Sequence, residues 1–300
     1  MKKVVLEKFK EFGADIVLFT VALSWGTTFI IVQDAIKDIP VFAFLFLRFF
    51  LSFILMILLS LKYIKQLDKT LVSSGIFLGT LFFLGYATQT YGLLYTKSSI
   101  VAFITGLNVV IVPMVVYLLF KQKVYIFSII GATVAAFGLW LLTGAGGLDS
   151  FGKGEFYSLL CATFFAIHIV YTAKLSKRYN IFLLVSIELF TVAMLSFFTS
   201  LLIDPFTFPK EYSYPLILAL VTTVLFATVY ALFMQTYMQQ FTTPAKTAII
   251  FTMEPASAAV FSYFYAGEVL STTQVAGAVI MIAAMLIAEI GSCYKSKSNL

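Results

Sequence analysis

The 300-residue chain is 61% hydrophobic and 17% aromatic, whereas only 11% of its residues are charged. Soluble domains typically carry about 25% charged residues, so this composition excludes an ordinary soluble domain. The net charge of +6 does not indicate a nucleic-acid partner, because Lys and Arg lie at the ends of apolar blocks and form no basic stripe between aromatics. Cys161 and Cys293 offer no disulfide framework and no metal-ligand spacing, and we expect no cofactor or metal.

The apolar residues come in blocks of about twenty, the length that crosses about 30 Å of hydrocarbon. Such blocks are typical of transmembrane helices, because each backbone polar group in lipid must be satisfied within its own segment. The sequence therefore predicts an all-α integral membrane protein with ten transmembrane helices. In chain order these are Ala14–Gln33, Val41–Leu61, Leu71–Leu94, Ser98–Phe120, Val124–Gly144, Gly154–Lys174, Ile181–Ile203, Tyr214–Gln235, Pro244–Ala266 and Ser271–Gly291.

The distribution of basic residues predicts the orientation of the spans. Most of the 20 Lys and Arg residues fall on the face that carries both chain ends, and the other face holds only Lys37, Lys97, Lys153 and Lys210. Basic residues concentrate on the cytoplasmic side of membrane proteins, so we expect both termini to be cytoplasmic in a multi-pass protein of the cell membrane. The loops are short, which leaves no room for a soluble catalytic domain.

The chain contains an internal repeat. Gln89-Thr90-Tyr91 recurs as Gln235-Thr236-Tyr237, and one offset superposes the third to fifth spans on the eighth to tenth. We therefore predict two five-helix repeats, residues 14–144 and 154–291. Because five is an odd number of spans, the second repeat must be inverted relative to the first. Inverted repeats are typical of secondary transporters, whose substrate site lies near the midplane between the halves.

Two charged residues occupy related positions inside spans. Arg48 lies in the second span, and the offset that places Phe42 on Phe182 places Arg48 on Glu188 in the seventh. Burying such a charge costs about 2.5–3.5 kcal/mol or more, which favours a function for each. The alternatives are that Arg48 extends to the outer interface or that the charges form a static structural pair.

Glu254 lies at the centre of the ninth span and is followed by Pro255, which removes a helical hydrogen bond and frees the carbonyl group of Phe251. A carboxylate beside a freed carbonyl can bind a cationic group or carry a proton; the alternative is a protonated Glu bonded to a neighbouring helix. The equivalent position in the fourth span is Asn108, with Pro113 one turn further on. Both repeats are therefore predicted to weaken this helix at mid-membrane.

Four further polar residues are candidates for the site. His168, the only histidine, is suited to proton coupling or to a structural hydrogen bond in the bundle. Gln89 and Gln235 of the repeated triplets are suited to orient a substrate or to bond between helices. Trp25, flanked by hydroxyl residues, gives the first span a polar, aromatic face that admits the same two interpretations.

These residues resemble the drug/metabolite transporter superfamily, specifically its ten-helix EamA-type members. The resemblance rests on "ALSWGTTFI", "LFLRFF", "MEPASAAVFSYFYAGE" and "QVAGAVIMIAAMLIA" in their order along nearly the whole chain. It implies export or exchange of small organic solutes, around a central cavity surrounded by helices one to four and six to nine. It also implies a structural role for Glu268, whose counterpart in the first repeat is Gln122 where an acidic residue is usual.

The sequence thus predicts a secondary active transporter, not an enzyme, that moves an amino acid, amine or similar metabolite across the plasma membrane by alternating access. An intramembrane enzyme is disfavoured, because the chain has one His and no HEXXH or GxSxG motif in a span. A multidrug efflux carrier and an uncoupled facilitator or channel stay open as alternatives. The expected partners are the substrate, the bilayer and coupling protons. A cavity with Arg48, Glu188 and Glu254 would suit a zwitterion.

Overall fold

The long apolar blocks fold as helices in a computed structural model, which describes residues 2–121, 126–143, 151–203, 209, 211–241, 247 and 250–297, with side chains from residue 12 to residue 287 except 128. Within those ranges, seven helices are long and apolar enough to cross a membrane. Two shorter apolar helices, Ile129–Leu142 and Thr272–Ile287, accompany them. The structure is thus that of an all-α integral membrane protein, and the count of ten spans and their orientation stay predictions.

The elements follow one another as a chain of helices joined by short connections. Their bounds are α1 Lys2–Ala35, α2 Val41–Ser60, η1 Leu61–Gln66, α3 Lys69–Tyr95, α4 Ser98–Gly106, α5 Asn108–Phe120, α6 Ile126–Leu142, α7 Lys153–Leu175, α8 Ile181–Ile203, α9 Tyr214–Thr222, η3 Thr223–Tyr230, α10 Ala231–Met238, α12 Met253–Ala266 and α13 Thr272–Lys297. The first residues of the predicted ninth span, from Pro244, lie largely outside the described residues, as does Gln122.

Two predicted spans are interrupted in the membrane, but not by the residues that the sequence indicates. In the fourth span the regular α-helical hydrogen bonding is interrupted at Leu107, between α4 and α5, although Leu107 keeps helical dihedral angles (φ −61°, ψ −11°), and Pro113 lies within α5. In the ninth span α12 begins at Met253, after Thr252. Pro255 therefore stands in the first turn of a new helix, where a missing N–H removes no intrahelical bond. That it frees the carbonyl group of Phe251 stays a prediction.

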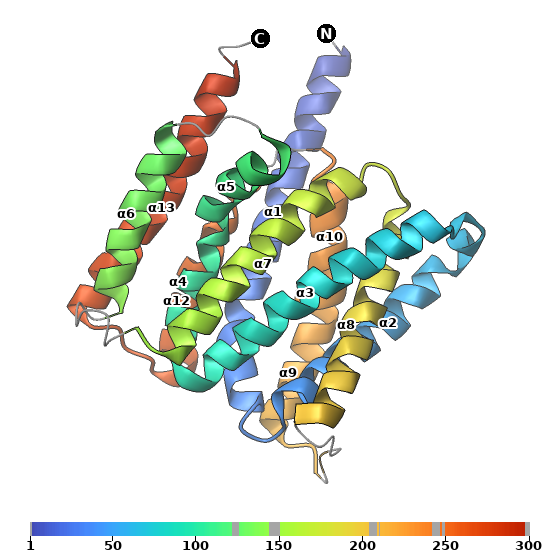
Figure 1. Ribbon diagram of the computed structural model, residues 1–300, viewed down its shortest axis with the longest axis horizontal. Helices are drawn as coiled ribbons and strands as arrows, with labels where there is room; N and C mark the ends of the chain where they lie inside the picture. The colour runs from blue at the N-terminus through green and yellow to red at the C-terminus, as the bar shows by residue number, and fades with distance from the viewer. Residues whose placement is uncertain are drawn as a thin grey trace.

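The helices are arranged as expected for two related halves. α6 packs against α13 at one edge of the bundle, and α2 packs against α8 (Figure 1). α3 packs against α7, and the equivalent contact after exchange of the repeats is that of α1 with α9, η3 and α10. Likewise, α1 packs against α12, and the equivalent contact is that of α7 with α4 and α5. Each contact thus recurs when the predicted repeats are exchanged, which supports an internal two-fold axis.

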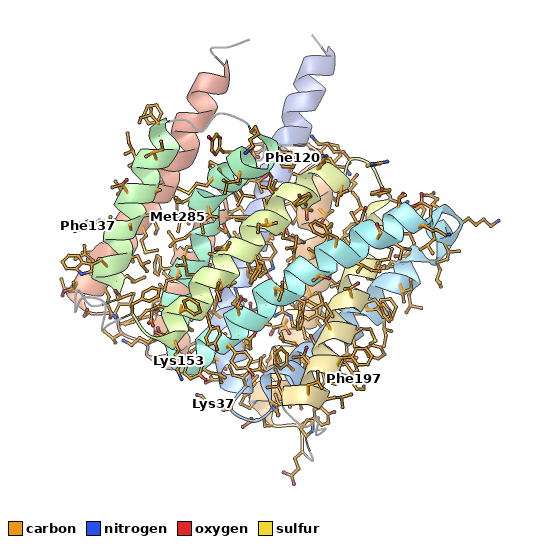
Figure 2. The ribbon with its side chains drawn as sticks, viewed as in Figure 1. Lys37, Phe120, Phe137, Lys153, Phe197 and Met285 are labelled. Atoms are coloured by element: carbon orange, nitrogen blue, oxygen red, sulfur yellow. The ribbon has the colours of Figure 1, made fainter. Side chains whose placement is uncertain are left out.

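The start of α1 and the end of α13 lie at the same end of the bundle (Figure 1). Lys37 and Lys153 lie at the opposite end, whereas Phe120 lies on the side of the chain ends (Figure 2). This arrangement agrees with the predicted face for each of the two lysines. The end of α12 is tied to the start of α4, because the Glu268 carboxylate accepts hydrogen bonds from the hydroxyl groups of Ser98 and Ser99. Glu268 therefore has the structural contacts that the resemblance implies.

Candidate functional site

A cavity of about 50 Å³ lies at the centre of the bundle, with walls from α1, α2, α3, α5, α7, α10 and α12. A volume of this size has room for a few water molecules. Seven of the eight residues predicted for the site line it: Trp25, Arg48, Gln89, Asn108, His168, Gln235 and Glu254. The eighth, Glu188, stands behind His168 and not on the cavity wall.

The cavity wall is built from equivalent positions of the two predicted repeats. The offset that superposes Phe42 on Phe182 brings Trp25 onto Phe165, Thr28 onto His168 and Phe29 onto Ile169, all in the wall; the other offset pairs Gln89 with Gln235 and Asn108 with Glu254. Equivalent positions of both predicted repeats thus contribute to one cavity. In inverted-repeat transporters the substrate site lies at the interface of the repeats.

Arg48 of α2 is buried in this wall with 3% of its surface exposed. Its Nε atom donates to the Thr228 hydroxyl at 2.9 Å, and an Nη atom donates to the Tyr86 hydroxyl at 3.2 Å. The guanidinium carbon also lies 4.5 Å from the centre of the Tyr86 ring. Neither Lys37–Asp34 nor His168–Glu188, the ion pairs seen between described residues, involves Arg48, and no described carboxylate pairs with it. Several of its five N–H donors stay available to a ligand.

Glu254 and Asn108 occupy the starts of two half-helices. Glu254 lies in the first turn of α12, and Asn108 is the first residue of α5. The buried Oδ1 atom of Asn108 has no hydrogen-bond partner, and the Glu254 side chain lines the cavity beside it. Buried oxygens without donors are uncommon, because each loses its hydration without replacement. Both residues line the cavity, and their side-chain oxygens are therefore suited to accept hydrogen bonds from a ligand.

Trp25 connects the cavity to an irregular helix. Its indole N–H donates to the carbonyl oxygen of Ala227 at 2.9 Å. Its ring packs against Phe251 in a T-shaped arrangement, with the ring centres 5.2 Å apart. Ala227 and Thr228 belong to η3, a stretch of π-helix. Such stretches displace the backbone and occur frequently at functional sites. Here η3 supplies the acceptors for both Trp25 and Arg48.

Tyr86 and Thr228 are residues of the site that the sequence reasoning missed. Tyr86 lies in an apolar run of α3, one turn before the Gln89 triplet, and lines the cavity. Its spacing of three from Gln89 places both on one face of a helix, which is a signal that the sequence contains. Thr228 carries no comparable signal, because its contact with Arg48 depends on the π-helical turn of η3.

The approach of α1 to α12 beside the site leaves no space for a side chain at Gly26. A Cβ atom at Gly26 would lie 2.5 Å from the carbonyl oxygen of Glu254 and 2.9 Å from the amide nitrogen of Ala258. We expect Gly26→Ala to displace α12, to lower stability by about 1–3 kcal/mol and to impair transport. Thermal unfolding in detergent measures the first effect. Gly13→Ala is the control, since a Cβ atom there meets nothing within 4 Å; equal stability of both variants would contradict the expectation.

Comparison with known proteins gives a consistent result. The model of the EamA-like transporter family matches residues 12–144 and again residues 152–289. A protein of Archaeoglobus fulgidus described as an uncharacterized transporter is 32% identical over 288 residues, which cover 95% of this chain and 88% of that protein. A solved crystal structure superposes with a TM-score of 0.69 over 93% of this chain and 96% of its own. Its sequence is 15% identical, so this likeness shows the fold alone.

Proposed function

The chain belongs to the EamA-like transporter family, and from this premise we propose that it is a secondary active transporter of a small zwitterion. The solute class is that of amino acids and similar metabolites, moved across the cell membrane by export or exchange through alternating access. In this proposal the residues 14–144 and 154–291 form two inverted repeats that move against each other around the central cavity.

The observation that carries the substrate class is the buried, unneutralised charge of Arg48. A buried cation without a counter-ion is strongly unfavourable, and the cost falls when an anion binds with good hydrogen-bond geometry. The planar fork of an arginine matches a carboxylate with two parallel hydrogen bonds. Because Tyr86 and Thr228 hold the guanidinium from the protein side, its remaining donors favour a carboxylate from a solute in the cavity.

Glu254 and Asn108 are suited to bind the cationic group of the same solute. A carboxylate and an amide oxygen are the groups that an ammonium ion binds, since it has three N–H donors and no acceptor. Both residues share the cavity with Arg48. A solute with one anionic and one cationic group therefore satisfies both parts of the wall at once. Gln89 and Gln235 supply neutral amides at equivalent positions of the two repeats for further hydrogen bonds.

The size of the cavity supports a mechanism in which the helices move. The cavity of about 50 Å³ is small for an amino acid, and in this proposal its walls separate further when the substrate binds. The interruptions at Leu107 and Thr252 divide the fourth and ninth predicted spans beside the site. Broken helices at this depth let half-helices tilt separately while their ends keep contact with a ligand.

A binding screen tests the proposal. Purified protein is heated in detergent with amino acids, amines, carboxylic acids, nucleosides and hydrophobic cations, and unfolding is followed by the emission of Trp25 and Trp140. We expect one or more zwitterionic amino acids to raise the melting temperature, and Arg48→Gln to remove the increase. Arg178→Gln, an exposed charge outside the cavity, is the control and should keep it. Stabilisation by hydrophobic cations alone would contradict the proposal and indicate multidrug efflux.

The same solute then separates a coupled carrier from a facilitator. A carrier concentrates the radiolabelled amino acid in proteoliposomes when an ion gradient is imposed. An uncoupled facilitator only equalises the concentrations on both sides. Accumulation above equilibrium is the expected result, and its absence under sodium, potassium and pH gradients would contradict active transport.

A further inference from the structure

His168 and Glu188 form a buried pair next to the cavity. The Nε2 atom of His168 lies 2.6 Å from an Oε atom of Glu188, and their side chains are 2% and 1% exposed. The Thr172 hydroxyl lies 3.3 Å from the same ring nitrogen. The imidazole ring stacks on Phe82, with ring centres 4.8 Å apart. The pair therefore brings together two groups that the sequence reasoning treated separately, on α7 and α8.

The charge of the pair depends on one proton. With a proton bound, imidazolium and carboxylate, or imidazole and carboxylic acid, sum to zero. Without it, one net negative charge remains in the hydrocarbon region, which is costly in the absence of a cation. A 2.6 Å contact between an imidazole nitrogen and a carboxylate oxygen holds a proton in either arrangement. The pair can therefore bind one exchangeable proton, whichever atom carries it.

Few other charges act on this pair. Titratable or charged side chains on the described elements that pack against α7 or α8 are Arg48 of α2; Lys69, Tyr86, Tyr91 and Tyr95 of α3; Tyr117 of α5; Tyr237 of α10; and Lys62, Tyr63 and Lys65 of η1. On α7 itself they are Lys153, Glu155, Tyr157, Cys161, Tyr171 and Lys174. Arg48, Tyr86 and Glu254 of α12 share the cavity wall with His168. Arg48 is the one fixed cation among these three.

The two members of the pair differ in their access to the cavity. His168 lines the wall, whereas Glu188 is reached only behind it. An imidazole ring accepts a proton at one nitrogen and releases another from its second nitrogen. His168 can therefore take a proton from water in the cavity at Nδ1 and pass the proton at Nε2 to Glu188. The carboxylate stores the proton without occupying space that a substrate needs.

From this geometry we propose that His168 and Glu188 are the proton-binding site of the transporter, separate from the substrate site at Arg48, Asn108 and Glu254. The role in coupling rests on the proposed function, whereas the proton site itself does not. His168 is the relay between the cavity and the pair, and Glu188 is the group that holds the proton while the halves move.

The proton site is tested without a substrate, because His168 is the only histidine of the chain. Protein labelled with ¹⁵N-histidine and purified without a histidine tag gives one imidazole signal by NMR. We expect Glu188→Gln to alter the pH dependence of this signal, because the carboxylate that faces Nε2 at 2.6 Å is gone. Glu211→Gln, an exposed carboxylate in a loop, is the control. An unchanged midpoint in Glu188→Gln would overturn the proposal.

The wild-type protein provides a second measurement if Glu188→Gln does not fold. A proton held between the Nε2 atom of His168 and the Glu188 carboxylate, on either atom, resonates far downfield and exchanges slowly with water. We expect this proton signal, correlated with the Nε2 nitrogen of His168. A ring that exchanges freely and shows no downfield proton would overturn the assignment of the pair.

Transport measurements test the coupling role with proteoliposomes and a ¹⁴C-labelled mixture of the twenty amino acids. In Glu188→Gln we expect exchange between internal and external amino acids to continue, while accumulation driven by a pH gradient of either orientation is lost. Accumulation equal to wild type, or loss of exchange together with accumulation, would overturn a separate proton site. If the wild-type protein exchanges none of the mixture, the proposed function fails, and the NMR result still decides the proton site.

Discussion

Arg48→Gln should weaken binding of the zwitterionic substrate by about 30-fold or more, because removing one partner of a buried charged hydrogen bond costs about 2 kcal/mol or more. The binding energy that is lost should be that of the substrate carboxylate. The variant should therefore bind the amino acid and its decarboxylated amine with similar affinity, whereas wild type should prefer the amino acid. Titration calorimetry of the two ligands against both proteins measures the difference.

Arg48→Lys makes the same test sharper. A lysine keeps the positive charge but lacks the planar fork that binds a carboxylate with two hydrogen bonds. The affinity of Arg48→Lys for the amino acid should lie between those of wild type and Arg48→Gln. Arg178→Gln should bind like wild type, since Arg178 is exposed and outside the cavity. Unchanged preference for the amino acid in Arg48→Gln would show that Arg48 is a structural group held by Tyr86 and Thr228.

Glu254→Gln should abolish proton-driven uptake of the substrate in proteoliposomes. The carboxylate is the one acidic group in the described cavity wall, so its loss removes the counter-charge for the substrate ammonium. Binding of the amino acid should weaken by a factor similar to that in Arg48→Gln, about 30-fold or more. The deaminated acid of the same carbon skeleton should bind the variant and wild type alike, because it makes no contact that requires the carboxylate.

The roles of Glu254 and Glu188 are distinguished by measuring substrate exchange in proteoliposomes without an imposed gradient. Glu254→Gln should lose both exchange and accumulation, because it removes part of the substrate site. Glu188→Gln should lose accumulation alone. Glu211→Gln provides the control for removing a glutamate from the surface. Transport by Glu254→Gln at the wild-type rate would remove Glu254 from the mechanism.

The sequence was sufficient for the helical blocks and for most polar residues of the cavity. In lipid, every long apolar segment must close its own hydrogen bonds, so composition alone predicts helices there. A polar residue in such a segment must face other helices or a cavity, which is why residues such as Gln89, Asn108 and Gln235 could be chosen from sequence. The structure places all three in one wall.

The pairing of the charges could not be predicted in the same way. The repeat relates Arg48 to Glu188, but residues related by an axis need not touch each other. In the structure Glu188 bonds to His168, and Arg48 bonds to Tyr86 and Thr228. Which groups meet depends on the rotation of each helix about its own axis. That rotation is set by the packing between helices, which a single sequence does not reveal directly.

The helix interruptions show a second limit. Proline is the strongest sequence signal for a break, and it indicated Pro113 and Pro255. The breaks instead fall at Leu107 and Thr252, because α5 accommodates Pro113 and α12 begins just before Pro255. The π-helix η3 has no proline or glycine at all. Its Ala227 and Thr228 accept hydrogen bonds from Trp25 and Arg48, which lie on other helices.

Uptake of three matched solutes into proteoliposomes tests the central claim most directly. These are the amino acid that stabilises the protein most, its decarboxylated amine and its deaminated acid, each radiolabelled. A zwitterion bound between Arg48 and the pair Asn108 and Glu254 predicts rapid, saturable uptake of the amino acid and slow uptake of the other two by wild type. Equal uptake of the amine and the amino acid would contradict a role for Arg48 as the carboxylate site and, with it, the proposed substrate class.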